Sequence, residues 1–187
     1  MGTKATKKKN KLEIETSTSG NKSETETSTL KDFHPSHERK ARKVFPVEEK
    51  GICYRLTDMN DVMSLAYKID GTVIPKGSNG ERKCDYLMLV QALDTLWVQI
   101  FIELKGQAVE HGLTQIKDTL QHEYFKTCPK QEKRCARLVI GSYPKSTNKT
   151  KEEKLIDDIR KSSGCSFRRM SIGEIETFAR LCKTLGI

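Results

Sequence analysis

The sequence has no long apolar run, few aromatic residues and no C-x-x-C pair. No stretch approaches the roughly 20 apolar residues that a membrane-spanning helix needs, so no membrane partner is expected. Apolar residues make up 35% of the 187 positions and aromatic residues 6%, while 32% of the positions are charged. The length and composition therefore predict one domain of ordinary size with a polar tail.

The sequence also lacks a zinc-binding motif, because no cysteine has the C-x-x-C or Cys/His spacing of a zinc site. No signal peptide is recognised at the N-terminus. These absences predict a cytoplasmic protein in a reducing compartment, with free and mostly packed thiols and no structural zinc ion. The six cysteines are Cys53, Cys84, Cys128, Cys135, Cys165 and Cys182.

The motifs of two common enzyme classes are absent as well. Gly77 and Gly80 lack the lysine arrangement of a phosphate-binding P-loop, so nucleotide hydrolysis is not expected. His111 and His122 have no paired metal-ligand spacing, and surface or helix-end roles are expected for them. No cysteine has a recognisable histidine partner for thiol catalysis.

Positive charge is in excess, with 34 Lys and Arg against 25 Asp and Glu and a net charge of +9. This balance indicates either a polyanionic partner such as nucleic acid or a solvated basic surface. Residues 1–45 contain mainly Thr, Ser, Lys and Glu and are predicted to be a disordered tail before a folded domain at 46–187. The basic clusters at 7–9 and 39–43 either contact phosphates or keep the chain soluble.

The pattern of residues 46–187 predicts an α/β fold. A short strand is expected at 52–56, and longer strands at 62–69, 83–90 and 97–105. Turn-forming residues separate these strands, so we expect the last three to form an antiparallel meander.

The hydrophobic period changes after residue 105. Apolar residues at 113, 116, 120 and 124 predict a helix over 112–125, and a short buried strand follows at 137–141. A helix between two strands indicates a crossover and a parallel pairing. The remaining predicted elements are a charged helix at 150–161, an edge strand at 166–170 and a last helix that begins at Ser171, with Glu174 completing a capping box.

Polar side chains interrupt the two central strands of this prediction. Glu103 and Lys105 are two residues apart on one strand, so they point to the same face, and Asp85 lies on the neighbouring strand. The strand that carries Glu103 is apolar on both faces, where a charge is costly unless it is paired, hydrated or bound to metal. Two converging carboxylates suit a hard divalent cation, and a nearby lysine can neutralise negative charge that develops on a phosphate.

Each of these residues also has a purely structural interpretation. Asp85 could begin a strand beside Lys83, and Glu103 and Lys105 could form an exposed ion-pair ladder. Gln115, on the helix that follows, could be solvated or could support the carboxylates from above the sheet. The ordered set on strand, strand and helix favours a metal site over these separate explanations.

The series Asp85, Glu103-Leu104-Lys105, helix and apolar strand resembles the PD-(D/E)XK nuclease superfamily over residues 62–143. The resemblance implies a restriction-endonuclease-like mixed central sheet flanked by helices, with the Asp and the ExK on a β-hairpin. It implies Mg²⁺, for which Mn²⁺ can substitute, held by Asp85, Glu103 and the backbone carbonyl of Leu104. Lys105 would be the catalytic lysine, and Gln115 matches a glutamine often found on the following helix.

The sequence departs from the family pattern at two points. Cys84 precedes Asp85 where the family often has proline, and no glutamate can be assigned to an early helix. Asp70 is the candidate for an additional metal ligand. Weaker candidates for the missing carboxylate are Glu48, Glu49, Asp58 and Asp61.

Three functions follow as hypotheses. The first is a divalent-metal-dependent endonuclease that hydrolyses phosphodiester bonds in DNA. The second is a catalytically inactive nucleic-acid-binding or protein-interaction module on the same fold, since a fold alone does not decide activity. The third is an unrelated α/β scaffold whose Glu103 and Lys105 form a surface ion pair. The sequence leaves open whether the chain forms a homodimer.

Overall fold

The computed structural model describes residues 37–39, 43–60, 62–75, 82–142 and 148–187. Most of the predicted tail, the basic cluster at 7–9 and Asp61 lie outside these residues. Strand β1 (His37–Arg39) and the start of β2 (Val44–Glu49) lie inside the range predicted as tail. Phe45 and Val47 on β2 are buried against the rest of the fold.

The fold is mixed α/β. The other strands are β3 (Ile52–Thr57), β4 (Ser64–Lys68), β5 (Tyr86–Leu93), β6 (Leu96–Lys105), β7 (Glu132–Ile140), β8 (Ser166–Ser171) and β9 (Glu176–Thr177). The helices are α1 (Val109–Gln121), α2 (Lys149–Ser163) and α3 (Phe178–Leu185).

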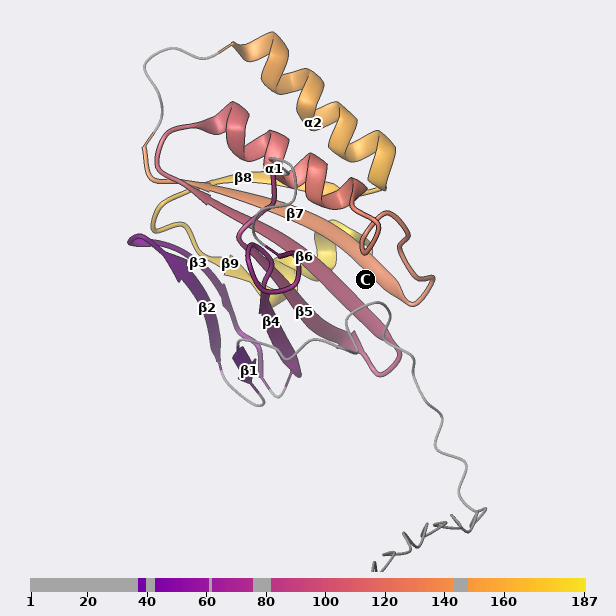
Figure 1. Ribbon diagram of the computed structural model, residues 1–187. Helices are drawn as coiled ribbons and strands as arrows, with labels where there is room; N and C mark the ends of the chain where they lie inside the picture. Colours follow the sequence, from indigo (N-terminus) through magenta and orange to yellow (C-terminus); the bar gives the residue numbers. More distant parts are fainter. Residues whose placement is uncertain (1–36, 40–42, 61, 76–81, 143–147) are drawn as a thin grey trace, which may run out of the picture.

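The strands form two mixed sheets (Figure 1). The larger sheet has the order β1-β4-β5-β6-β7-β8, and the smaller sheet has the order β2-β3-β9. Strands β4, β5 and β6 form the predicted antiparallel meander, and β7 joins β6 in parallel after the α1 crossover. The predicted meander, crossover and parallel pairing are confirmed.

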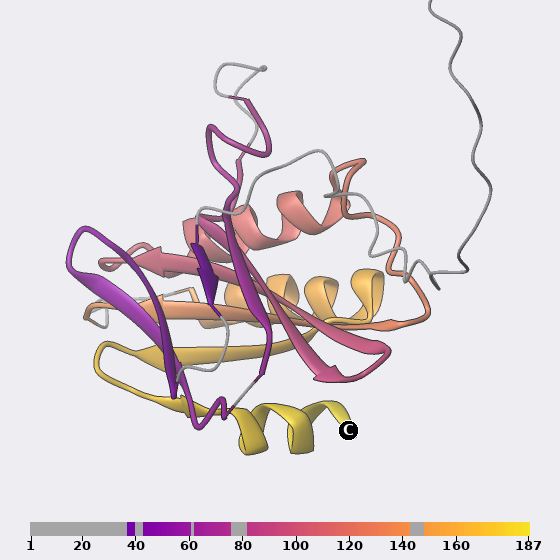
Figure 2. The ribbon, with the colours of Figure 1, turned by 90° about the horizontal axis from the view of Figure 1, so that it is seen from below.

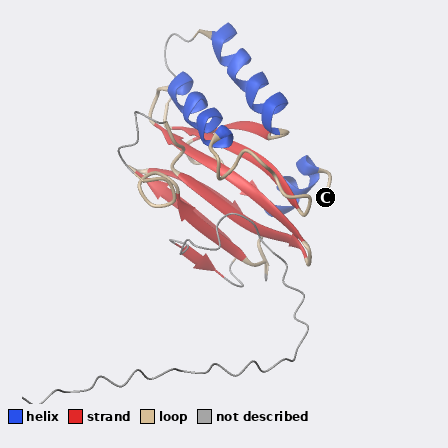
Figure 3. Ribbon diagram, turned by 45° about the vertical axis from the view of Figure 1, so that its right-hand side comes forward, coloured by secondary structure: helices blue, strands red, loops and turns tan. Residues whose placement is uncertain are grey.

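Different layers cover the two faces of the larger sheet. Helices α1 and α2 lie on one face, while the smaller sheet and α3 lie on the other (Figures 2 and 3). Strand β6 alternates between the two cores, since Phe101 packs under the helices whereas Ile100 and Ile102 pack against the smaller sheet. The predicted α/β class is confirmed, but a strand layer covers much of the face opposite α1.

A buried ion pair joins the two sheets. Arg137 on β7 donates to both carboxylate oxygens of Glu176 on β9, at 2.7 and 2.9 Å. The Tyr54 hydroxyl on β3 donates to the same carboxylate at 2.8 Å, and all three side chains are fully buried. Each charge therefore has partners in an interior where an unpaired charge would be strongly destabilising.

The predicted strand at 137–141 is too short, because β7 begins at Glu132. Three of its four charged residues, Glu132, Arg134 and Arg137, are buried, while Lys133 is exposed. Arg134 donates to the Gln99 side-chain oxygen at 2.9 Å, and the Gln99 amide donates to Glu132. These cross-strand partners offset the cost of burying polar groups and extend the strand.

The predicted capping box at Ser171 does not begin a helix. One of the two hydrogen bonds of a capping box is present, since the Ser171 N–H donates to the Glu174 carboxylate at 3.1 Å. The chain makes a turn there with Gly173 at φ +82°, continues into β9, and enters α3 only after the Thr177 N-cap. Pairing of Glu176 with Arg137 holds this segment in strand β9, which explains why the local helix signal fails.

All six cysteines are free thiols and four of them are buried, as predicted. None of the helices in the described part of the chain combines the length and apolar character that crossing a bilayer requires.

Candidate active site

The end of the β5–β6 ladder brings Asp85 next to Glu103. Tyr86 pairs with Ile102 in the antiparallel register, so Asp85 and Glu103 occupy the next position across the two strands. Asp85 accepts a hydrogen bond from the Leu104 backbone N–H at 2.7 Å. The predicted convergence of these carboxylates at one end of two neighbouring strands is present in the structure.

Glu103 is the most deeply buried member of the site. It has no exposed surface, and its two carboxylate oxygens receive no aligned hydrogen bond from the residues that the structure describes. Lys105 Nζ lies 2.6 Å from Glu103 Oε1, which makes an ion pair on the shared strand face. The Lys105 side chain is 20% exposed, so this face of the site opens toward solvent.

Burial raises the pKa values of both carboxyl groups, and the charge of Asp85 adds to this effect at Glu103. Burial raises the pKa of Glu103 most, and the Asp85 charge raises it further, to about 8, although Lys105 acts in the opposite direction. Burial also raises the pKa of Asp85, while the hydrogen bond from Leu104 lowers it and the charge of Glu49 raises it. Two raised carboxyl pKa values mean that the surrounding residues do not fully stabilise the charged form of either group.

Helix α1 approaches the site closely at Gly112. A Cβ atom at this position would lie 2.6 Å from Leu138 Cδ1, 3.0 Å from Lys105 Cγ and 3.4 Å from Glu103 Cγ. The absence of a side chain therefore lets the helix pack directly over the strand that carries the ion pair. This contact shields Glu103 from water on the helical side.

Two side chains of α1 hold the segment that leads into Asp85. Gln115 Nε2 donates to the Lys83 carbonyl at 2.6 Å, and Thr119 Oγ1 accepts from the Cys84 N–H at 2.8 Å. These bonds take residues 83 and 84 away from strand pairing, which explains why β5 begins at Tyr86 and not at the predicted Lys83. Gln115 thus lies near the site, where it supports the backbone before Asp85.

Sequence reasoning missed Thr119, treated Glu49 only as a weaker candidate carboxylate, and gave His111 a surface or helix-end role. Thr119 is fully buried beneath Cys84, and its position on the Gln115 face of α1, one turn further on, is the signal that could have identified it. Glu49 is the candidate early carboxylate whose charge acts on Asp85. His111 is exposed on α1, and its pKa is lowered by partial burial and then by the charges of Lys105 and Arg82.

Asp70 lies in the turn after β4 and is exposed. It forms a β-bridge with Ile74, while its neighbour Ile69 donates a backbone hydrogen bond to the Asp85 carbonyl at 2.9 Å. Asp70 is therefore one residue beyond the position that bonds to Asp85, and its charge is not among those that act on the Asp85 or Glu103 carboxyl groups.

The available donors fit a magnesium ion with a small protein ligand set. In the part of the chain that the structure describes, no three His, Cys, Asp or Glu side chains group as a metal site. Mg²⁺ is often held by only one or two carboxylates together with water and substrate phosphates. The Glu103 oxygens, buried without aligned hydrogen bonds, are what such a cation would satisfy. The backbone N–H and C=O of a strand residue point to the same side, so the Leu104 carbonyl lies on the Asp85 side of β6.

None of the protein-family models, curated proteins or solved structures compared with this chain matches it.

Proposed function

We propose that this chain is a Mg²⁺-dependent nuclease that hydrolyses phosphodiester bonds in DNA. The observation that carries the proposal is the pair Asp85 and Glu103, adjacent across β5 and β6, with Lys105 Nζ 2.6 Å from Glu103. An acidic pair whose charge is only partly compensated is expected where a cation and a phosphate bind. The net charge of +9 is consistent with an anionic polymer as substrate.

We also propose that the larger sheet has the restriction-endonuclease-like arrangement. The supporting features are the β4-β5-β6 meander, the α1 crossover and the parallel strand β7, in that order along the chain. The acidic pair lies at the end of the central hairpin of this arrangement. The family often has a glutamate on an early helix, whereas here the β2–β3 hairpin carries Glu49, whose charge acts on Asp85.

Each residue of the site has a distinct proposed role. Asp85, Glu103 and the Leu104 carbonyl would hold the cation, which when bound supplies Lewis-acid stabilisation of the phosphate and an activated water. The Lys105 ammonium orients the attacking water or donates to a phosphate oxygen as negative charge accumulates. Gln115, through the Lys83 carbonyl, keeps the Asp85 segment in place.

A second candidate function is a catalytically inactive nucleic-acid-binding module on the same scaffold. The observation that favours it is the close ion pair between Glu103 and Lys105, which partly neutralises both residues without any cation. In this case the basic chain would bind nucleic acid, and the acidic pair would have a structural role.

A cleavage assay separates these two functions. Single-stranded, duplex and branched DNA are incubated with the full chain in Mg²⁺, in Mn²⁺ and in chelator. We expect metal-dependent cleavage and a loss of rate of about 10²-fold or more in Lys105→Ala, with a smaller change in substrate binding. Lys183→Ala, an exposed lysine on α3, is the matched control. Full cleavage by a folded Lys105→Ala protein would exclude the assigned catalytic role.

A further inference from the structure

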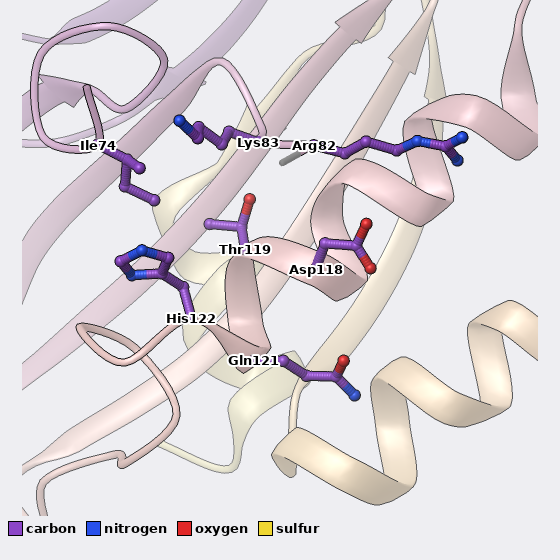
Figure 4. Close-up of a pocket in the computed structure, with 7 residues that line it drawn as sticks. All are labelled: Ile74, Arg82, Lys83, Asp118, Thr119, Gln121 and His122. Atoms are coloured by element: carbon purple, nitrogen blue, oxygen red, sulfur yellow. The ribbon is translucent and has the colours of Figure 1, made fainter. Parts of the chain in front are cut away.

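A cavity of about 350 Å³ lies beside the candidate active site. It is formed where the segment that leads into Asp85 passes the C-terminal half of α1 (Figure 4). The lining side chains are those of Ile74, Arg82, Lys83, Asp118, Thr119, Gln121 and His122. None of the proposed cation ligands lines the cavity, so it is separate from the acidic pair.

The cavity and the acidic pair share a wall. Thr119, in the middle of the cavity lining, accepts the hydrogen bond from the Cys84 N–H, and the next residue is Asp85. Gln115 holds the Lys83 carbonyl one helical turn earlier, and Lys83 also lines the cavity. Since residues 83 to 85 run from the cavity lining to the acidic pair, a strand with a phosphate at the acidic pair would have its adjoining nucleotide near the cavity.

The two ends of the cavity differ in chemistry. Ile74 and His122 lie at one end, and Arg82 and Asp118 lie toward the other (Figure 4). His122 Nδ1 accepts from the Tyr124 N–H at 3.3 Å, and the two rings meet edge to face with centroids 4.8 Å apart. The imidazole is therefore held in place as a flat surface beside an aliphatic side chain. Such a surface suits stacking of a nucleobase.

The polar end suits the rest of a nucleotide. Arg82 is an exposed guanidinium that can contact a phosphate, while Asp118 and Gln121 can accept or donate hydrogen bonds at a base edge. Partial burial raises the pKa of Asp118, and the charge of Arg82 opposes this rise. Partial burial lowers the pKa of His111, and the charges of Lys105 and then Arg82 lower it further. Arg82 thus acts electrostatically on a group of the cavity and on a group that Lys105 also affects.

We propose that this cavity binds one unpaired nucleotide of the substrate strand, next to the phosphodiester bond at Asp85, Glu103 and Lys105. The proposal rests on the proposed nuclease function and specifies its substrate class. A volume of about 350 Å³ is at the lower end of small-molecule sites, which matches a single nucleotide. A nucleotide in a duplex must leave the stack to enter, at a cost of a few kcal/mol that an unpaired nucleotide avoids. The preferred substrate is therefore single-stranded DNA or a duplex with an unpaired nucleotide at the cleaved position.

Binding and cleavage are measured separately, so that the two proposals can fail separately. Three labelled DNA substrates of the same sequence are compared: a single strand, a full duplex and a duplex with one unpaired nucleotide. Binding is measured in chelator, and cleavage is measured in Mg²⁺. The variants are Arg82→Ala and His122→Asn, since the Asn side-chain oxygen can still accept from the Tyr124 N–H. Arg180→Ala, an exposed arginine on α3, is the matched control.

We expect the wild type to prefer the two substrates with unpaired nucleotides by at least tenfold in binding. Both variants should lose most of this preference and bind the full duplex as before, while Arg180→Ala should behave like the wild type. Equal binding of all three substrates, or a preference that both variants keep, would overturn the cavity assignment even if Lys105-dependent cleavage is found. A preference that depends on Arg82 and His122 without any cleavage would support the cavity and overturn the nuclease function.

Discussion

The Asp85 carboxylate accepts the backbone N–H of Leu104 at 2.7 Å, which ties it to the residue between Glu103 and Lys105. This side-chain bond continues the β5–β6 contact one position past the last pair, Tyr86 and Ile102. The position of one carboxylate therefore depends on the backbone that carries the other. The site is arranged by the sheet itself, which gives the rigidity that a metal or phosphate site needs.

Glu103→Gln should leave the protein without metal as stable as the wild type or more stable, because it removes a buried charge that Asp85 repels. The folded pKa of Glu103 is about 8, above its ordinary value of 4.5, so the folded state keeps a proton that the unfolded state releases. The contribution of Glu103 to stability therefore falls as pH rises from 4.5 to 8, and stays low above that. The advantage of the variant should be absent below pH 4.5 and largest above pH 8. Thermal unfolding in chelator across this range measures it.

The same variant should also lose stabilisation by metal. A ligand that binds only the folded state adds about 2.7 kcal/mol at 100 times its dissociation constant. Mg²⁺ should therefore raise the melting temperature of the wild type and not that of Glu103→Gln. Glu110→Gln, an exposed glutamate paired with Lys151, is the control and should retain the metal response. A less stable Glu103→Gln protein in chelator would indicate that Glu103 serves mainly as the structural partner of Lys105.

Thr119→Val should weaken magnesium binding even though Thr119 is not a proposed ligand. Valine has nearly the same shape but cannot accept the Cys84 N–H, and a buried unpaired donor costs about 1–3 kcal/mol. The backbone before Asp85 should then shift. Thr119→Ser retains the hydroxyl and should bind metal like the wild type. Magnesium titration by calorimetry tests the pair, and equal affinity of the Val and Ser variants would contradict this positioning role.

Glu176→Gln should be strongly destabilising, because it leaves Arg137 as a buried charge without its anionic partner. Breaking such a pair costs about 3–5 kcal/mol, whereas Tyr54→Phe should cost about 1 kcal/mol because the ion pair remains. Urea unfolding at pH 7 measures both. Equal losses of unfolding free energy in the two variants would show that the ion pair is not the main contribution of Glu176 to stability.

Glu176 should also contribute to acid sensitivity. Burial would raise the pKa of Glu176, but the hydrogen bonds and charge of Arg137 outweigh it and lower the pKa below 4.5. A lowered folded pKa means that this stability is present above pH 4.5 and is lost as pH falls through 4.5 and the folded pKa. Glu176→Gln should therefore lose less stability than the wild type between pH 5 and pH 3. An identical pH dependence in both proteins would contradict this assignment.

Gly112→Ala should destabilise the fold modestly, although alanine is the better helix residue. Helix propensity favours the change by about 1 kcal/mol, while overpacking against Leu138 and Lys105 costs about 1–3 kcal/mol. Leu138→Val shortens the side chain that the new methyl group would meet. The double variant should therefore be more stable than the sum of the single changes predicts. Additive free energies of unfolding in the double-mutant cycle would contradict the close contact.

The sequence alone determined the strands and helices whose signals are local. Apolar runs separated by turn-forming residues predicted the meander, and apolar residues at 113, 116, 120 and 124 predicted the helix that is α1. The shared face of Glu103 and Lys105 followed from their spacing alone, because strand side chains alternate. These predictions succeeded because each depends only on residues that are neighbours along the chain.

Only the tertiary structure decided the features that join distant segments. Glu176 enters a strand and not a helix because Arg137, 39 positions earlier, pairs with it. Spacing places Thr119 on the Gln115 face of α1, but only the fold of α1 back over the sheet decides that its hydroxyl accepts from the Cys84 N–H. The protonation of the site also depends on distant segments, since burial under the helix and the charge of Asp85 raise the pKa of Glu103. Sequence pattern sets which face a side chain takes, whereas long-range packing sets its partners and its solvent exposure.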